Sequence, residues 1–86
     1  MLHVRAKERM RSGELPTYGP SSSYAGRGSS ISCALCDAPI LASEVELELE
    51  FVAAGADRKV IRLHSGCESV WNEERLRLRN YQNAPD

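Results

Sequence analysis

The chain has 86 residues, so it holds at most one domain, and that domain can bury only a small core. It has three cysteines, an odd number that fits poorly with a disulfide framework of the secreted type. Its net charge of −1 argues against a protein that binds nucleic acid along its whole length. No apolar run at the N-terminus is long enough for a signal peptide or a membrane span. We therefore predict a cytoplasmic protein without membrane association, whose small core needs a staple such as a metal ion.

The segment 1–31 is expected to be a flexible basic N-terminal arm followed by a linker. The first 30 residues carry five basic and two acidic side chains, whereas the rest of the chain carries six and ten. The basic stretch at 1–11 is too short for a stable isolated helix. The stretch 12–32 is dominated by Ser, Gly, Pro and Tyr and offers little apolar surface to offset the entropy of ordering it. We predict a folded domain over 32–82 and a C-terminal tail at 83–86.

The predicted domain opens with a cysteine pair and continues as a β-hairpin. Cys33 and Cys36 are followed by turn residues that include Pro39. The segment 44–52 then alternates glutamate with apolar residues at period two, which is the pattern of a half-buried strand. A turn centred on Gly55 leads to a second strand at 58–63.

Charge and apolar pattern agree on one register for this hairpin. If Ile61 and Leu63 share the inner face with the apolar residues of the first strand, then Arg58 and Arg62 lie on the outer face with the glutamates. The inner residues of the first strand are Val45, Leu47, Leu49 and Phe51. The glutamates of the outer face are Glu44, Glu46, Glu48 and Glu50, and we expect them to form an exposed acidic face.

A helix is predicted from Ser65 or Gly66 to Asn80. Ser65 and Glu68 have the spacing of a capping box. Its apolar face consists of Cys67, Val70, Trp71, Leu78 and Tyr81, with Glu74 as the polar exception. The elements together predict a small metal-stabilised α+β fold made of a knuckle, a β-hairpin and a C-terminal α-helix.

Two pairs of metal-type ligands have the same spacing. Cys33 and Cys36 are separated by two residues, and so are His64 and Cys67. Zinc needs four donors placed tetrahedrally, and a pair with this spacing can direct both side chains at one ion. The hairpin between the pairs returns the chain to its starting point, so the four side chains can converge. We predict one structural Zn²⁺ ion as cofactor, held by Cys33, Cys36, His64 and Cys67.

An alternative without metal assigns each residue a separate role. Cys33 and Cys36 could be a buried or redox-active pair, Cys67 a small core residue of the helix and His64 a surface residue at the strand end. A thiol-exchange motif normally lies at the start of a helix in an α/β fold, however, whereas here a turn and a hairpin follow Cys36. The pattern favours the metal site.

The pattern resembles the treble-clef zinc fingers, in which a Cys-x-x-Cys knuckle, a β-hairpin and a helix surround one zinc ion. The resemblance covers about 32–81. It implies that Cys33 and Cys36 are knuckle ligands, that His64 ends the second strand and that Cys67 lies in the first helical turn. The His-x-x-Cys order is similar to that of the first finger of LIM domains, although the hairpin is longer here and no second ligand set follows.

A shell of three thiolates and one imidazole has no open position for water, so the zinc is expected to be structural. We identify no catalytic residue and expect no small-molecule substrate, since the glutamates, the serine run and His3 are each better explained as solvated surface or linker. The chain is therefore not expected to be an enzyme.

Function is then expected to lie on the surface. The leading hypothesis is an interaction module that docks on a protein partner, because the acidic face would repel phosphate. The alternative is nucleic-acid binding through the basic residues of the arm and the helix, which are Arg5, Lys7, Arg9, Arg11, Arg75, Arg77 and Arg79. The helix arginines are spread around the axis and can pair with nearby glutamates, which favours a solvated face.

Overall fold

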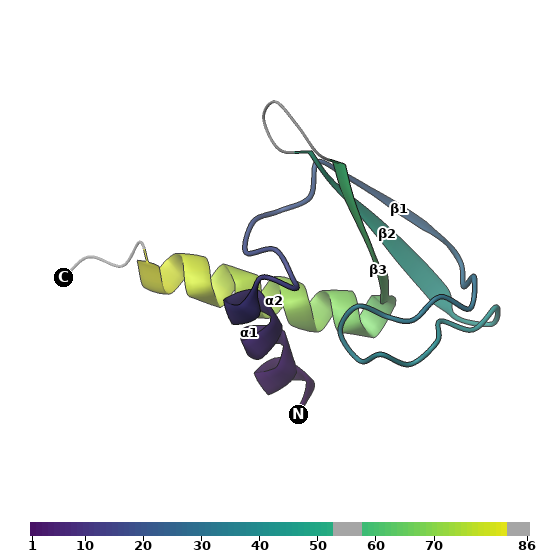
Figure 1. Ribbon diagram of the computed structural model, residues 1–86, viewed down its shortest axis with the longest axis horizontal. Coiled ribbons are helices and arrows are strands. Elements are labelled where there is room, and N and C mark those ends of the chain that lie inside the picture. Colours follow the sequence, from purple (N-terminus) through teal and green to yellow (C-terminus); the bar gives the residue numbers. More distant parts are fainter. Residues whose placement is uncertain (53–57, 83–86) are drawn as a thin grey trace.

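The computed structural model describes residues 1–52 and 58–82, and for residues 81 and 82 it describes the backbone alone. Five elements follow in chain order: α1 (Leu2–Ser12), β1 (Ser22–Arg27), β2 (Val45–Val52), β3 (Arg58–His64) and α2 (Ser65–Gln82). The strands form one antiparallel sheet in the order β1-β2-β3, and both helices pack against each other (Figure 1). The predicted turn around Gly55 and the tail at 83–86 lie outside the described residues.

The hairpin has the predicted register. Leu47 lies opposite Leu63 and Leu49 lies opposite Ile61, while Glu48 lies opposite Arg62 on the other face. Phe51 and three of those four apolar residues are buried, and Leu47 is partly buried.

Val45 differs from the expectation of an inner residue, because it is 50% exposed. It pairs with Arg27 of β1, and the pairing of β2 with β3 begins one residue later, at Glu46. The first residue of β2 therefore lies beyond the apolar layer that the hairpin shares with α2.

The expectation of an exposed acidic face is wrong for Glu46, which is only 8% exposed. Its Oε1 accepts hydrogen bonds from the backbone N–H and the hydroxyl of Ser29 at 3.0 and 2.7 Å, and its Oε2 lies 3.4 Å from Nε of Arg62. The next two glutamates are matched by β3 arginines, Glu48 by Arg62 at 2.8 Å and Glu50 by Arg58 at 2.7 Å. The outer face of the hairpin is thus largely neutralised.

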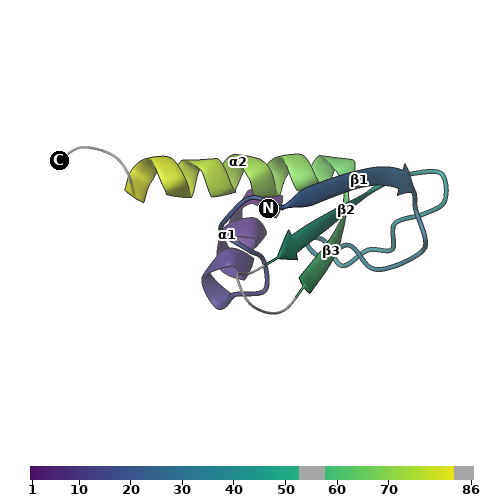
Figure 2. The same ribbon diagram turned by 90° about the horizontal axis from the view of Figure 1, so that it is seen from above.

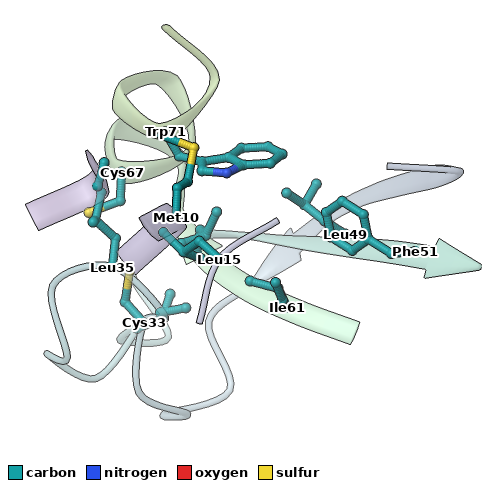
Figure 3. Close-up of a cluster of buried hydrophobic side chains, with 12 residues drawn as sticks. Met10, Leu15, Cys33, Leu35, Leu49, Phe51, Ile61, Cys67 and Trp71 are labelled. Carbon is teal, nitrogen blue, oxygen red and sulfur yellow. The ribbon is translucent and has the colours of Figure 1, made fainter. Parts of the chain in front are cut away.

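The predicted C-terminal helix begins at Ser65, as expected, and extends to Gln82. Trp71 is its largest buried side chain, and its ring meets that of Phe51 edge to face at 6.1 Å between centroids (Figure 3). Its indole N–H donates to the carbonyl of Pro16 at 2.9 Å. Trp71 therefore ties α2 both to the sheet and to the segment that follows α1.

Residues expected to be a flexible arm form α1 instead. Ala6 and Met10 lie four residues apart on its buried face, and Leu15 is buried directly after the helix (Figure 3). Gly13 ends the helix with a φ of 86°, a left-handed conformation that glycine adopts without steric cost, and its N–H donates to the Met10 carbonyl at 3.3 Å. An isolated helix of this length is marginal in water, so burial against the core stabilises α1.

Part of the expected linker forms β1, which pairs with β2 from Ser22 opposite Glu50 to Arg27 opposite Val45. Among the described helices and strands, β1 packs only on β2, so its backbone pairing places it in the sheet. Gly28 follows, and a Cβ there would lie 2.0 Å from the Leu41 carbonyl oxygen, so only glycine allows this close approach. The folded unit includes most of the segment predicted as arm and linker.

The views along two axes show that α2 runs past the sheet, with its C-terminal half beyond the strands (Figures 1 and 2). α1 packs beside it. Neither helix, as far as the structure describes them, combines the length and the apolar character needed to cross a membrane.

Candidate metal centre

Cys33 and Cys36 lie in a tight loop closed by its own backbone. The Cys33 N–H donates to the Ala38 carbonyl at 2.8 Å, and the Asp37 N–H donates to the Cys33 carbonyl at 2.9 Å. Asp37 has a φ of 68°, a left-handed conformation that aspartate tolerates better than most residues. We call this tight loop of residues 33–38 the knuckle.

The second ligand pair lies where β3 passes directly into α2. His64 is the last residue of β3, and Cys67 is in the first turn of α2. The knuckle is held against β3 by a hydrogen bond from the Ala34 N–H to the Arg62 carbonyl at 2.9 Å. Two segments far apart in the sequence therefore meet at one point.

The four predicted ligands form one cluster, with all ligand atoms within 4.8 Å of one another. Nδ1 of His64 lies 3.4 Å from Sγ of Cys36 and 4.0 Å from Sγ of Cys67, and all three cysteines are free thiols. For bonds of about 2.3 Å to sulfur and about 2.0 Å to nitrogen, tetrahedral zinc separates its ligand atoms by roughly 3.5 to 3.8 Å. The cluster fits a single zinc ion, and its donor set is one that zinc prefers.

The outward nitrogen of the imidazole is held by neighbouring oxygens. Nε2 of His64 lies 3.3 Å from the Pro39 carbonyl oxygen and 3.4 Å from Oε1 of Glu44. In the tautomer with its proton on Nε2, the imidazole donates to the Pro39 carbonyl and leaves the lone pair of Nδ1 facing the thiols, an arrangement common around metal-bound histidines. Glu44 is itself held by the Leu41 N–H, which donates to its Oε1 at 2.8 Å.

The thiols affect one another strongly. Burial works to raise the pKa of Cys33, but hydrogen bonds from the backbone of Cys36, His64 and Leu35 outweigh it and lower that pKa to about 7. Burial, together with the charge of Cys33, raises the pKa of Cys67 to about 12. A divalent cation between the sulfurs would relieve this repulsion and allow all three to bind as thiolates.

Side chains of α1 hold the knuckle in place through contacts that the sequence did not predict. Arg9 donates to the Ala34 carbonyl at 2.6 Å and makes a two-pronged pair with the Asp37 carboxylate, at 3.0 and 2.6 Å. Arg5 donates to the Cys36 carbonyl at 3.2 Å. The hydrogen bond from Arg9 lowers the pKa of Asp37. No local pattern signals this contact, because the partners are more than 20 residues apart.

Replacing Arg9 with Ala is expected to loosen α1 from the knuckle, because no other α1 side chain makes this two-pronged pair with Asp37. Hydrogen exchange should become faster at the amides of α1 and of the knuckle, while the β2–β3 hairpin keeps its protection. Replacing the exposed Arg11 with Ala is the matched control. Unchanged exchange in α1 of the Arg9 variant would show that the contact does not hold the helix.

A second cluster of potential ligands, which includes His3, is better explained as an ion-pair junction between the helices. His3, Glu73 and Glu74 bring ligand atoms within 4.8 Å of one another. Glu74 is only 2% exposed, and its carboxylate already faces Nδ1 of His3 at 2.7 Å, Nη1 of Arg77 at 3.1 Å and Nζ of Lys7 at 3.7 Å. The side chains of Lys7 and Arg77 would repel a metal ion.

Replacing Glu74 with Gln should destabilise the protein by roughly 1 to 2 kcal/mol. The hydrogen bond with His3, with the nearby charges of Arg77 and Lys7, lowers the pKa of Glu74. A lowered pKa stabilises the folded state above the ordinary value of about 4.3, so the whole effect should appear in urea unfolding at pH 7. The cost is modest because the basic partners are partly exposed. An effect no larger than that of Glu73→Gln, at an exposed neighbour, would contradict this role.

Comparison with known proteins finds no match: no family model fits the chain, and no curated protein or solved structure is significantly similar to it. The class is therefore defined by fold and site alone. The chain is a small α+β protein, with one helix, a three-stranded antiparallel sheet and a C-terminal helix, and it carries a cluster of three cysteines and one histidine that could hold a metal ion.

Proposed function

We propose that this chain is a structural zinc module of the treble-clef type, with one Zn²⁺ ion held by Cys33, Cys36, His64 and Cys67. The observation that carries the proposal is the convergence of these four side chains from the knuckle and from the β3–α2 junction. The ion would cross-link these two segments. Three free cysteines in one cluster also fit a reducing compartment such as the cytoplasm.

The proposed zinc is structural rather than catalytic. Three thiolates and one imidazole complete a tetrahedral shell and leave no position for a reacting water. The zinc would supplement a core to which the chain contributes few large apolar side chains. We accordingly propose a binding role for the surface of the module, without enzymatic activity or a small-molecule substrate.

The charge distribution supports docking on a protein over docking on nucleic acid. Arg5 and Arg9 contact the knuckle, Arg75 lies over the ring of Trp71, and Arg77 pairs with Glu73 and Glu74. Affinity for nucleic acid depends on several cations that are free to neutralise phosphates on one face. These four of the seven basic residues that favoured that alternative therefore already contact other groups of the protein.

Two measurements test the proposal. In a heteronuclear NMR spectrum of the zinc-loaded chain, a chelator should collapse the amide dispersion, and added zinc should restore it. Dispersion that survives complete metal removal would refute the structural zinc. Titration with DNA and RNA at low salt should show no binding, whereas binding that weakens steeply with salt would favour the nucleic-acid alternative.

A further inference from the structure

A cavity of about 490 Å³ lies between α1 and the C-terminal half of α2. Its volume is within the range of about 300 to 1,000 Å³ that is usual for ligand pockets. The residues from α1 are Lys7, Met10 and Arg11, and those from α2 are Glu74, Arg77 and Leu78. Neither the zinc cluster nor the sheet uses this cavity, which we call the interhelical groove.

The interhelical groove combines apolar and cationic side chains. Met10 is buried and Leu78 is partly buried, whereas the side chains of Lys7 and Arg77 are more than half exposed and Arg11 is exposed. Arg11 has no ion-pair partner among the described residues, so its charge is available to a ligand. This composition favours an occupant that has an apolar group flanked by negative charges.

The apolar wall of the groove distinguishes between two kinds of anionic occupant. Met10 and Leu78 line the groove, whereas Oε1 of Glu74 is buried, with Nζ of Lys7 3.7 Å away. A peptide can place an apolar side chain on Met10 and Leu78 and its carboxylates beside the cations. The phosphates of a nucleic acid supply negative charge but no apolar group.

We infer that the interhelical groove binds an acidic peptide segment with a Leu or Phe anchor. The anchor side chain packs on Met10 and Leu78. The flanking carboxylates pair with the cations of the groove, which are Lys7, Arg11 and Arg77. This inference rests on the proposed function, because the groove needs α1 in place and Arg9 holds α1 on the zinc knuckle.

The inference is tested by fluorescence anisotropy with the full zinc-loaded chain. The probe is a short fluorescein-labelled peptide with one Leu between Asp and Glu residues. We expect a dissociation constant on the order of micromolar, and at least about a tenfold loss when Ser replaces the Leu or Gln replaces the acidic residues. The Arg11→Glu variant should lose about tenfold or more. The matched control is Arg79→Glu, at an exposed α2 position outside the cavity, and it should bind as the parent does.

Several results would overturn the inference. They are absence of binding by a zinc-loaded chain with a dispersed NMR spectrum, equal losses from Arg11→Glu and Arg79→Glu, and binding that does not depend on the Leu. Binding of single-stranded DNA or RNA that depends on Arg11 would assign the groove to nucleic acid instead. The NMR spectrum separates these failures from failure of the zinc module, because only the latter removes the dispersion.

Discussion

Removal of zinc is expected to unfold the protein. Structural zinc contributes about 10 to 16 kcal/mol of binding energy in small domains, whereas the whole stability of a small protein is about 5 to 15 kcal/mol. Without the ion, the knuckle and the β3–α2 junction lose their cross-link, and a buried cluster of thiols remains. The remaining apolar core is too small to compensate.

The same outcome is expected for substitution of one ligand. Cys36→Ser should abolish stoichiometric zinc binding and give the far-ultraviolet circular dichroism of an unfolded chain. Ser32→Ala, at an exposed position beside the knuckle, is the matched control and should fold and bind zinc normally. A Cys36→Ser protein that keeps the parent spectrum without metal would show that the fold does not need the ion.

The second large effect is expected from Trp71→Ala, which should cost about 3 to 5 kcal/mol. Trp71 is 1% exposed, packs edge to face on Phe51, and donates its indole N–H to the Pro16 carbonyl. The substitution creates a cavity between α2 and the sheet and leaves that buried carbonyl without its donor. Trp71→Phe retains much of the volume and should cost less.

Urea unfolding at saturating zinc measures this effect without loss of the metal. Leu76→Ala is the matched control, because Leu76 is an apolar residue of the same helix that is 41% exposed, and its effect should be within about 0.5 kcal/mol. If Trp71→Ala and Leu76→Ala had equal effects, Trp71 would not be the residue that joins α2 to the sheet.

The features that sequence analysis predicted well depend on strong local patterns. The alternation in 44–52 defines the strand and its face, and the matching charges of the returning strand define the register. The start of α2 at Ser65 agrees with the position that the spacing of Ser65 and Glu68 predicted. The ligand cluster was predictable because two pairs of equal spacing flank a hairpin that brings its own ends together.

The elements that the sequence did not predict are stabilised by contacts between residues that are far apart in the sequence. α1 is too short to be stable alone, and it is held by Ala6 and Met10 in the core and by the pairing of Arg9 with Asp37. β1 consists mainly of small and polar residues, and its position depends on the backbone of β2. Composition alone made both segments resemble a flexible arm.

The buried carboxylates were missed for the same reason. The alternating pattern of the strand places Glu46 on the exposed face, yet Ser29 and Arg62 contact its carboxylate. Ser29 belongs to a segment expected to be a linker. Glu74 was a polar exception on an apolar helix face, and its partners His3 and Lys7 are on α1. Because α1 and the segment around Ser29 were not predicted, the partners that they supply to Glu74 and Glu46 were not predicted either.

X-ray absorption at the zinc edge, on protein purified with zinc and analysed for metal content, tests the central claim most directly. We predict one zinc ion per chain, with a shell of three sulfur atoms at about 2.3 Å and one nitrogen atom at about 2.0 Å. A chain that retains no zinc, or a shell of mainly oxygen and nitrogen atoms, would contradict the assignment of Cys33, Cys36, His64 and Cys67 as its ligands.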